Sequence, residues 1–126
     1  MVTGVQTCAL PIYIEDGCKE GNPAALLTAE VYVNRVINVV GGYYAQLGGA
    51  DAIVFTGGIG ENDTNMRKMI CDRLSAAFGI QLDEVLNGKT RGKEVLLSTA
   101  ESKVAVWLIP TNEELMIARD TYRLIA

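Results

Sequence analysis

The sequence DAIVFT, residues 51–56, runs directly into GGIGEN, residues 57–62. The four apolar residues at 52–55 leave no polar face, which is typical of a strand buried in a parallel sheet. A second stretch of this kind, VAVWLI at 104–109, runs into PTNEE at 110–114. Because the carboxyl ends of parallel strands meet at one edge of a sheet, we expect the two loops to face one cleft.

Helical patterns surround these strands. Asn22 and Pro23 predict the start of a helix that ends before Gly48 and Gly49. Its apolar positions recur at helical spacing, namely Leu26, Ala29, Val33, Val36, Ile37, Val40, Tyr44 and Leu47. Val31, Tyr32 and Val39 lie off that stripe, so we expect the helix to be covered on more than one side.

The rest of the chain completes an α/β pattern. Helices are expected from about residue 63 to 78 and from 112 to about 124, and a further strand is expected at 95–97. Residues 88–92 predict a loop, and Trp107 is expected in the core. We expect Arg67, Arg73, Arg91, Arg119 and Arg123 to be solvated charges on helix faces or in a loop.

Composition excludes several classes of function. The chain has 126 residues, of which 49% are hydrophobic and 21% charged, as in one soluble globular domain. A net charge of −4 argues against nucleic acid or an anionic membrane as a partner. The absence of histidine argues against a zinc site or a His-based triad. The odd set of Cys8, Cys18 and Cys71 favours the reducing cytoplasm, with Cys18 and Cys71 as buried or incidental thiols.

The glycines at positions 57, 58 and 60 permit a close approach of backbone to a ligand, and the helix that follows favours an anion. No Gly-Lys-Ser/Thr follows, so the loop is not a Walker A motif, and Asp63 takes the place of the third glycine of a dinucleotide fingerprint. Two interpretations remain open on these residues. One is a tight turn with Asn62 capping the next helix; the other is a nucleotide loop that includes Glu61 and Asn62.

The second loop carries two adjacent glutamates. Thr111 and Glu114 have the spacing of a capping box, which gives Glu114 a structural role. Glu113 is not needed for that cap. Its carboxylate can hold a hydrated Mg²⁺ together with phosphates, or it can interact with the helix dipole for ~0.3–1 kcal/mol. The residues alone leave both roles open.

Three segments resemble the C-terminal portion of the acetate kinase family. They are EGNPAALLTAEVYVNRVINVVGGYYAQLGGADAIVF at 20–55, DAIVFTGGIGEN at 51–62 and VWLIPTNEELMIARDTYRLIA at 106–126. The resemblance covers residues 13–126 and implies the fold shared by sugar kinases, actin and heat-shock ATPases. We therefore expect an incomplete C-terminal domain with about two parallel core strands and flanking helices. The strand at 51–56 would then lose its neighbour and expose an apolar edge, so the isolated chain would be loosely folded or aggregation-prone.

The resemblance also assigns roles to residues. Five of them match the family's adenine-nucleotide loop, namely Gly58, Ile59, Gly60, Glu61 and Asn62, and Glu113 matches its magnesium-binding glutamate. The implied reaction is reversible phosphoryl transfer between ATP and acetate, giving ADP and acetyl phosphate, by a homodimeric enzyme. The matched portion contains no catalytic residue, so we expect the chain alone to be inactive.

Three further interpretations belong beside this one. Residues 1–12, MVTGVQTCALPI, are interpreted as a non-native segment, and residues 13–126 as a nucleotide-binding half-domain. The parent enzyme could instead be a propionate or butyrate kinase. Alternatively, the chain is a stand-alone nucleotide-binding or dimerisation module that uses the apolar helix at 23–47.

Overall fold

The computed structural model describes residues 13–125, apart from the side chain of Glu113, so the interpretation of residues 1–12 lies outside the described residues. Residues 13–19 are helical. The elements that follow are α2 (Pro23–Leu47), β1 (Ala52–Phe55), α3 (Gly57–Asn62), α4 (Thr64–Phe78), α5 (Glu84–Lys89), β2 (Val95–Leu96), β3 (Ala105–Leu108) and α6 (Glu113–Ile125). This order confirms the α/β prediction. In the part of the chain described here, no helix is long and apolar enough to cross a membrane.

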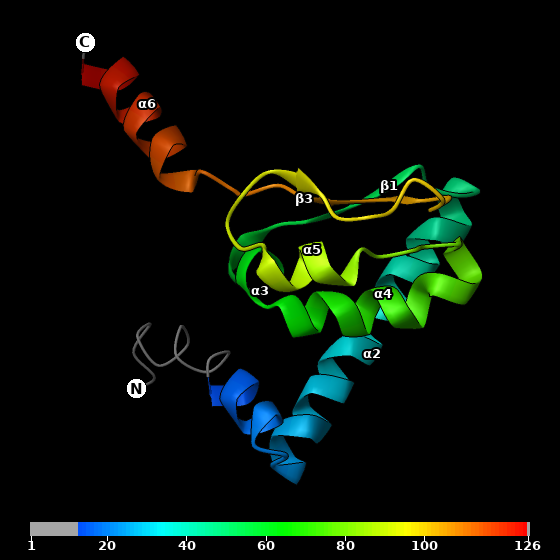
Figure 1. Cartoon of the computed structure of the whole chain (residues 1–126). Helices are drawn as coiled ribbons and strands as arrows, with labels where there is room; N and C mark the ends of the chain where they lie inside the picture. Colours follow the sequence, from blue (N-terminus) through cyan, green and yellow to red (C-terminus); the bar gives the residue numbers. More distant parts are fainter. Residues whose placement is uncertain (1–12, 126) are drawn as a thin grey trace.

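The sheet has three strands in the order β1-β3-β2. β1 and β3 are parallel, with Ile53 opposite Val106 and Phe55 opposite Leu108, which confirms the two parallel core strands. β2 adds a third strand, antiparallel to β3. Helices α4 and α5 lie along one side of this sheet, and α2 crosses behind α4 (Figure 1).

Burial on both faces of the strands was expected, and for β1 this is wrong. Ile53 and Phe55 are half-buried against the core, whereas Val54 points to the opposite face and is 49% exposed. Trp107 of β3 is only half-buried, while Val106 and Leu108 are fully buried. Within residues 13–125 the helices thus bury only one face of the sheet, because α6 extends away from the rest of the chain (Figure 1).

The core lies between α2, α4 and the inner face of the sheet. Its buried hydrophobic members are Ala29, Val33, Met66, Ile70, Cys71, Leu74, Phe78, Ile80, Leu97, Val104, Val106 and Leu108. Tyr44 stacks on Phe78 with ring centroids 3.8 Å apart, which joins the end of α2 to the end of α4. Val31, Tyr32 and Val39 are exposed, so in the described residues α2 is covered on one side only, contrary to expectation.

Local capping explains where the helices begin and end. The Asn22 side chain accepts from the N–H groups of Ala24 and Ala25, and Gly48 ends α2 at φ 70°, as predicted. Gly79 ends α4 in the same left-handed conformation. The loop predicted at 88–92 begins later than expected, because residues 88 and 89 belong to helix α5. The Asp83 side chain caps this helix by accepting from the N–H of Leu86, and the helix continues through Gly88.

The outer edge of β1 generates a prediction about the isolated chain. β1 pairs on one side only in the described sheet, so its other edge is open to pairing between copies. Val54→Lys places a charge on that strand and should lower the rate of aggregation severalfold, measured by light scattering. Val39→Lys is the matched control, because Val39 on α2 is exposed to a similar extent, 54% against 49% for Val54. An equal effect of both variants, or an effect of Val39→Lys alone, would contradict edge pairing.

Candidate functional site

The two strand-to-helix loops meet in one cleft, as the sequence predicted. The cleft has a volume of about 420 Å³. Gly57, Gly58 and Glu61 line it from α3, at the carboxyl end of β1. The residues on its other side are Thr111, Asn112 and Glu114, beyond the carboxyl end of β3.

The Glu61 carboxylate joins the two sides of this cleft. Its Oε1 accepts hydrogen bonds from the N–H of Gly57 at 2.9 Å, the N–H of Thr111 at 2.9 Å and the Thr111 hydroxyl at 3.0 Å. The bond from the Thr111 N–H is the largest of the effects that lower the pKa of Glu61 below its ordinary value. The ionised Glu61 carboxylate therefore links α3 to the segment that leads into α6. These three hydrogen bonds are called the Glu61 clasp.

This clasp replaces the predicted capping box. The Thr111 N–H, which Glu114 would accept from in a capping box, donates to Glu61 instead. Asn112 caps α6, because its Oδ1 accepts from the N–H of Leu115 at 3.1 Å. Glu114 is exposed and lines the cleft.

The glycine-rich segment is a short helix, α3, and not a coil. Gly57 has φ 71°, a conformation that favours glycine at this entry to the helix. The Asn62 amide donates to the carbonyl of Gly58 at 3.0 Å. Asn62 does not cap the next helix as one interpretation expected, since Asp63 accepts from the N–H of Met66 at 2.9 Å.

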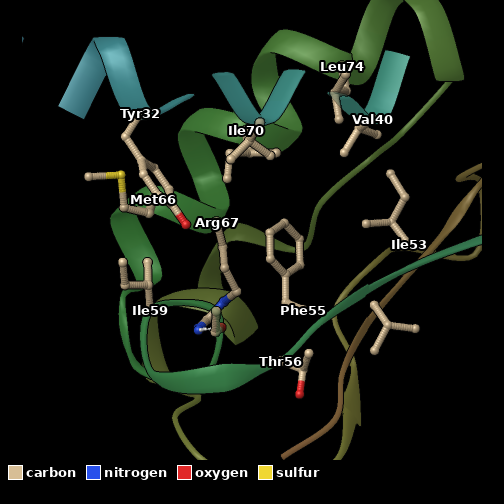
Figure 2. A pocket seen from close by; sticks show the side chains of 13 residues that line it. Tyr32, Val40, Ile53, Phe55, Thr56, Ile59, Met66, Arg67, Ile70 and Leu74 are labelled. Atoms are coloured by element: carbon tan, nitrogen blue, oxygen red, sulfur yellow. Dashed lines mark hydrogen bonds between the residues drawn. The ribbon is translucent and has the colours of Figure 1, made fainter. Parts of the chain in front are cut away.

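The predicted nucleotide-binding residues lie on two sides of α3. Gly58 and Glu61 line the cleft. Ile59 and Gly60 line a separate, mainly apolar cavity of about 180 Å³ behind α3, between α2, β1 and α4 (Figure 2). Asn62 folds back onto its own helix. Glu113, the predicted metal ligand, is the first residue of α6, at the far side of the cleft from α3.

Sequence reasoning missed the role of Arg67. Arg67 was expected to be a solvated charge, but its side chain is fully buried beneath α3. A signal was present, because Arg67 lies on the same helical stripe as Cys71, Leu74 and Phe78, all of which are buried. Arg73 of the same helix meets the expectation of an exposed charge and pairs with Glu30 across the surface.

The thiols are consistent with the sequence interpretation. Cys71 is buried and Cys18 is half-buried, and both are free. Burial raises the pKa of Cys71 to about 12, so this thiol stays protonated and unreactive. Between residues 13 and 125, Glu113 side chain apart, no group of three His, Cys, Asp or Glu side chains is arranged to hold a metal ion.

Comparison with known proteins places these loops in a family. The sequence model of the acetokinase family matches residues 2–119. The chain belongs to the acetokinase family. It is 53% identical over 112 residues to an acetate kinase of Treponema denticola, covering 89% of this chain and 28% of that protein.

Solved structures of the family have the same fold. The acetate kinase of Porphyromonas gingivalis matches with a TM-score of 0.76 at 44% identity, covering 90% of this chain and 28% of that chain. A propionate kinase of Francisella tularensis matches with a TM-score of 0.73 at 37% identity, covering 84% and 26%. The sheet and its helices are thus part of a domain of the kinase fold, and the chain spans little more than a quarter of these relatives.

The Glu61 clasp predicts a pH dependence of stability. A suitable host is a chimera in which the matching 112 residues of the Treponema denticola enzyme are replaced by those of this chain, hereafter the chimera. Because the folded state lowers the pKa of Glu61, its contribution is present above the ordinary carboxyl pKa and is lost as the pH falls through the folded value.

We expect Glu61→Ala to lower the free energy of unfolding by about 1 kcal/mol near neutral pH, with solvent screening limiting the loss. The difference from the parent chimera should shrink as the solution is acidified, measured by urea unfolding at several pH values. Glu114→Ala is the control, since its carboxylate faces the same cleft without the three donors. A Glu61→Ala difference that is independent of pH would contradict an ionised clasp.

Proposed function

We propose that this chain is the nucleotide-binding portion of an acetate kinase, which transfers a phosphoryl group reversibly between ATP and acetate to give ADP and acetyl phosphate. The observation that carries the proposal is the cleft itself. Two loops that resemble family motifs meet there, and Glu61 holds them at hydrogen-bond distance. Adenine nucleotide would bind against α3, the helix that contains the matched residues Gly58, Ile59, Gly60, Glu61 and Asn62, with Gly58 and Glu61 facing it in the cleft.

Gly58 leaves room for a ligand close to the backbone in this cleft. A Cβ built on Gly58 would meet nothing within 4 Å, and its φ lies outside the left-handed region. Neither packing nor backbone conformation therefore demands glycine at this wall of the cleft. A ligand that approaches the backbone closely would demand it.

Glu113 is the proposed magnesium ligand. The side chains that line the cleft offer a metal ion oxygen ligands only, among them the Glu114 carboxylate, and Glu113 lies at the adjoining start of α6. Such a set fits Mg²⁺, which takes one or two carboxylates and completes its shell with water and phosphate oxygens. When bound, the ion would neutralise charge on the phosphates during transfer. In this arrangement the chain's own residues bind and orient the nucleotide.

The acetate site and the groups that act on the transferred phosphoryl would lie in the other three quarters of a full-length kinase. On this proposal the chain alone is inactive, and the full-length enzyme is a cytoplasmic homodimer without nucleic-acid or membrane partners. The test is catalysis by the chimera, measured as acetyl phosphate formed from ATP and acetate with Mg²⁺. A folded chimera that binds no Mg·ADP and forms no acetyl phosphate would refute the proposal.

A propionate kinase is the second candidate, because the Francisella tularensis propionate kinase has the same fold over this segment. The two enzymes share the nucleotide reaction and differ in acyl chain. A full-length protein carrying this sequence would decide between them by its ratio of kcat/KM for acetate, propionate and butyrate. A third possibility, a stand-alone binding or dimerisation module, requires the isolated chain to be a discrete species that binds Mg·ADP in size-exclusion and calorimetric titrations.

Because Gly58 is open to the cleft, adding a side chain there should lower nucleotide affinity without lowering stability. Gly58→Ala should raise the Kd of the chimera for Mg·ADP about tenfold, equivalent to ~1.4 kcal/mol of binding free energy. Gly42→Ala is the matched control, since it also adds a methyl group in open space on a helix. Both variants should keep or raise the melting temperature. An unchanged Kd in Gly58→Ala would argue against nucleotide at this wall.

The magnesium assignment predicts a metal-dependent effect. Glu113→Gln keeps the shape of the side chain and removes its charge, so the Mg²⁺ concentration that gives half-maximal activity should rise about tenfold or more. ADP binding without metal should be unchanged in calorimetry. Glu114→Gln serves as the control, with a smaller shift expected. Equal Mg²⁺ dependence in Glu113→Gln and the parent chimera would remove Glu113 from the metal site.

A further inference from the structure

Helix α3 is intrinsically unstable and depends on hydrogen bonds from outside the helix. It has six residues, three of them glycine, and a helix this short and glycine-rich is unstable alone. The carbonyls of residues 58–61 each receive a donor from a side chain or from a residue outside the helix. These pairs are Gly58 O with Asn62 Nδ2 at 3.0 Å, Ile59 O with Asp63 N at 2.9 Å, Gly60 O with Arg67 Nη1 at 2.8 Å and Glu61 O with Gly92 N at 3.1 Å.

Arg67 makes more hydrogen bonds than any other of these donors. Besides Gly60, its Nε donates to Asn87 Oδ1 at 2.8 Å, and its Nη2 donates to the carbonyls of Asn87 at 3.2 Å and Thr90 at 2.7 Å. The guanidinium thus joins α3 to the end of α5 and the residue that follows it. Asn87 in turn donates to the carbonyl of Thr64 at 2.9 Å, which ties α5 to the first turn of α4.

All four acceptors of Arg67 are neutral oxygens. Among the side chains that the structure describes, which exclude Glu113, no Asp or Glu forms an ion pair with it. Burial lowers the pKa of Arg67, and the nearby charge of Arg91 acts in the same direction, while the charge of Asp63 opposes both without forming an ion pair. Burying a cation without an ion-pair partner costs free energy, which an apolar side chain of similar size would avoid. What arginine adds here is a planar guanidinium that donates hydrogen bonds in fixed directions.

Gly60 lies between Arg67 and the end of β1. Arg67 Nη1 donates to the Gly60 carbonyl at 2.8 Å, and a Cβ built on Gly60 would lie 3.4 Å from the backbone carbonyl carbon of Phe55, within van der Waals contact. Figure 2 shows Arg67 reaching toward α3, with Phe55 and Ile59 on either side of it. α3 therefore sits at a set depth between the end of β1 and the guanidinium. Its opposite side, at Gly58, forms the wall of the cleft.

We propose that Arg67 is a positioning residue for the nucleotide, which acts through the Gly60 carbonyl to set the depth of α3 in the cleft wall. Asn87 belongs to the same device, as the group that orients the guanidinium. This inference rests on the proposed nucleotide site. It adds that a residue with no contact with the cleft controls nucleotide affinity and leaves acetate affinity alone.

Arg67→Lys in the chimera tests the inference, because lysine keeps the charge but cannot reach all four oxygens. The Kd for Mg·ADP and the KM for ATP should rise about tenfold, while the KM for acetate stays within about twofold, at a temperature well below unfolding. Amide hydrogens of residues 57–62 should exchange faster. Arg73→Lys, the same substitution on an exposed face of α4, is the matched control and should change none of these.

Asn87→Ala is the second variant, in case Arg67→Lys does not fold. It removes one acceptor of the guanidinium and should raise the nucleotide KM in the same direction by a smaller factor. Loss of stability with an unchanged nucleotide KM, or equal changes in both KM values, would overturn positioning in favour of a purely structural role. If Gly58→Ala weakens binding and neither Arg67→Lys nor Asn87→Ala does, the nucleotide site stands and this inference fails. If the parent chimera binds no Mg·ADP, both fail.

Discussion

The two sides of the cleft are joined through one oxygen atom, Oε1 of Glu61, which accepts hydrogen bonds from both. The loops that it joins follow strands that pair in parallel, so the sheet brings them to one edge but does not fix the gap between them. The Thr111 N–H and hydroxyl, 50 residues along the chain, set that gap. The sheet thus gives the coarse placement of the site, and a single carboxylate gives the fine placement.

The glycines explain why so much support is needed. Glycine at positions 57 and 58 leaves the backbone open along the cleft wall, and together with Gly60 these glycines make α3 unstable. The surrounding chain compensates with donors for the exposed carbonyls, of which Arg67 and Gly92 come from outside the immediate neighbourhood of the helix. Hydrogen bonds on the side of α3 away from the cleft thus hold the helix in place while its cleft side stays open.

Features with a local cause could be predicted from sequence. The bounds of α2 follow from Asn22 and Gly48, and the strands at 52–55 and 105–108 follow from short apolar runs. Features that depend on distant partners could not. The predicted Thr111 capping box was wrong because the Thr111 N–H donates to Glu61, which lies 50 residues away in the sequence. Helix α5 was missed because Gly88 indicated a loop, whereas the contact that holds Asn87 in place comes from Arg67, 20 residues earlier.

The two charged side chains nearest the glycines therefore have roles that charge alone does not suggest. Sequence reasoning placed Glu61 among the ligand contacts and Arg67 in solvent, yet each has its charged group engaged by the protein: Glu61 by three donors and Arg67 by four acceptors. On the α3 side of the cleft, these bonds leave the backbone at Gly58 open. Backbone contacts recognise a nucleotide only where the main chain lies at the right depth. On the proposed function, affinity would therefore be sensitive to groups behind α3, because Gly58 has no side chain that could compensate for an error in depth.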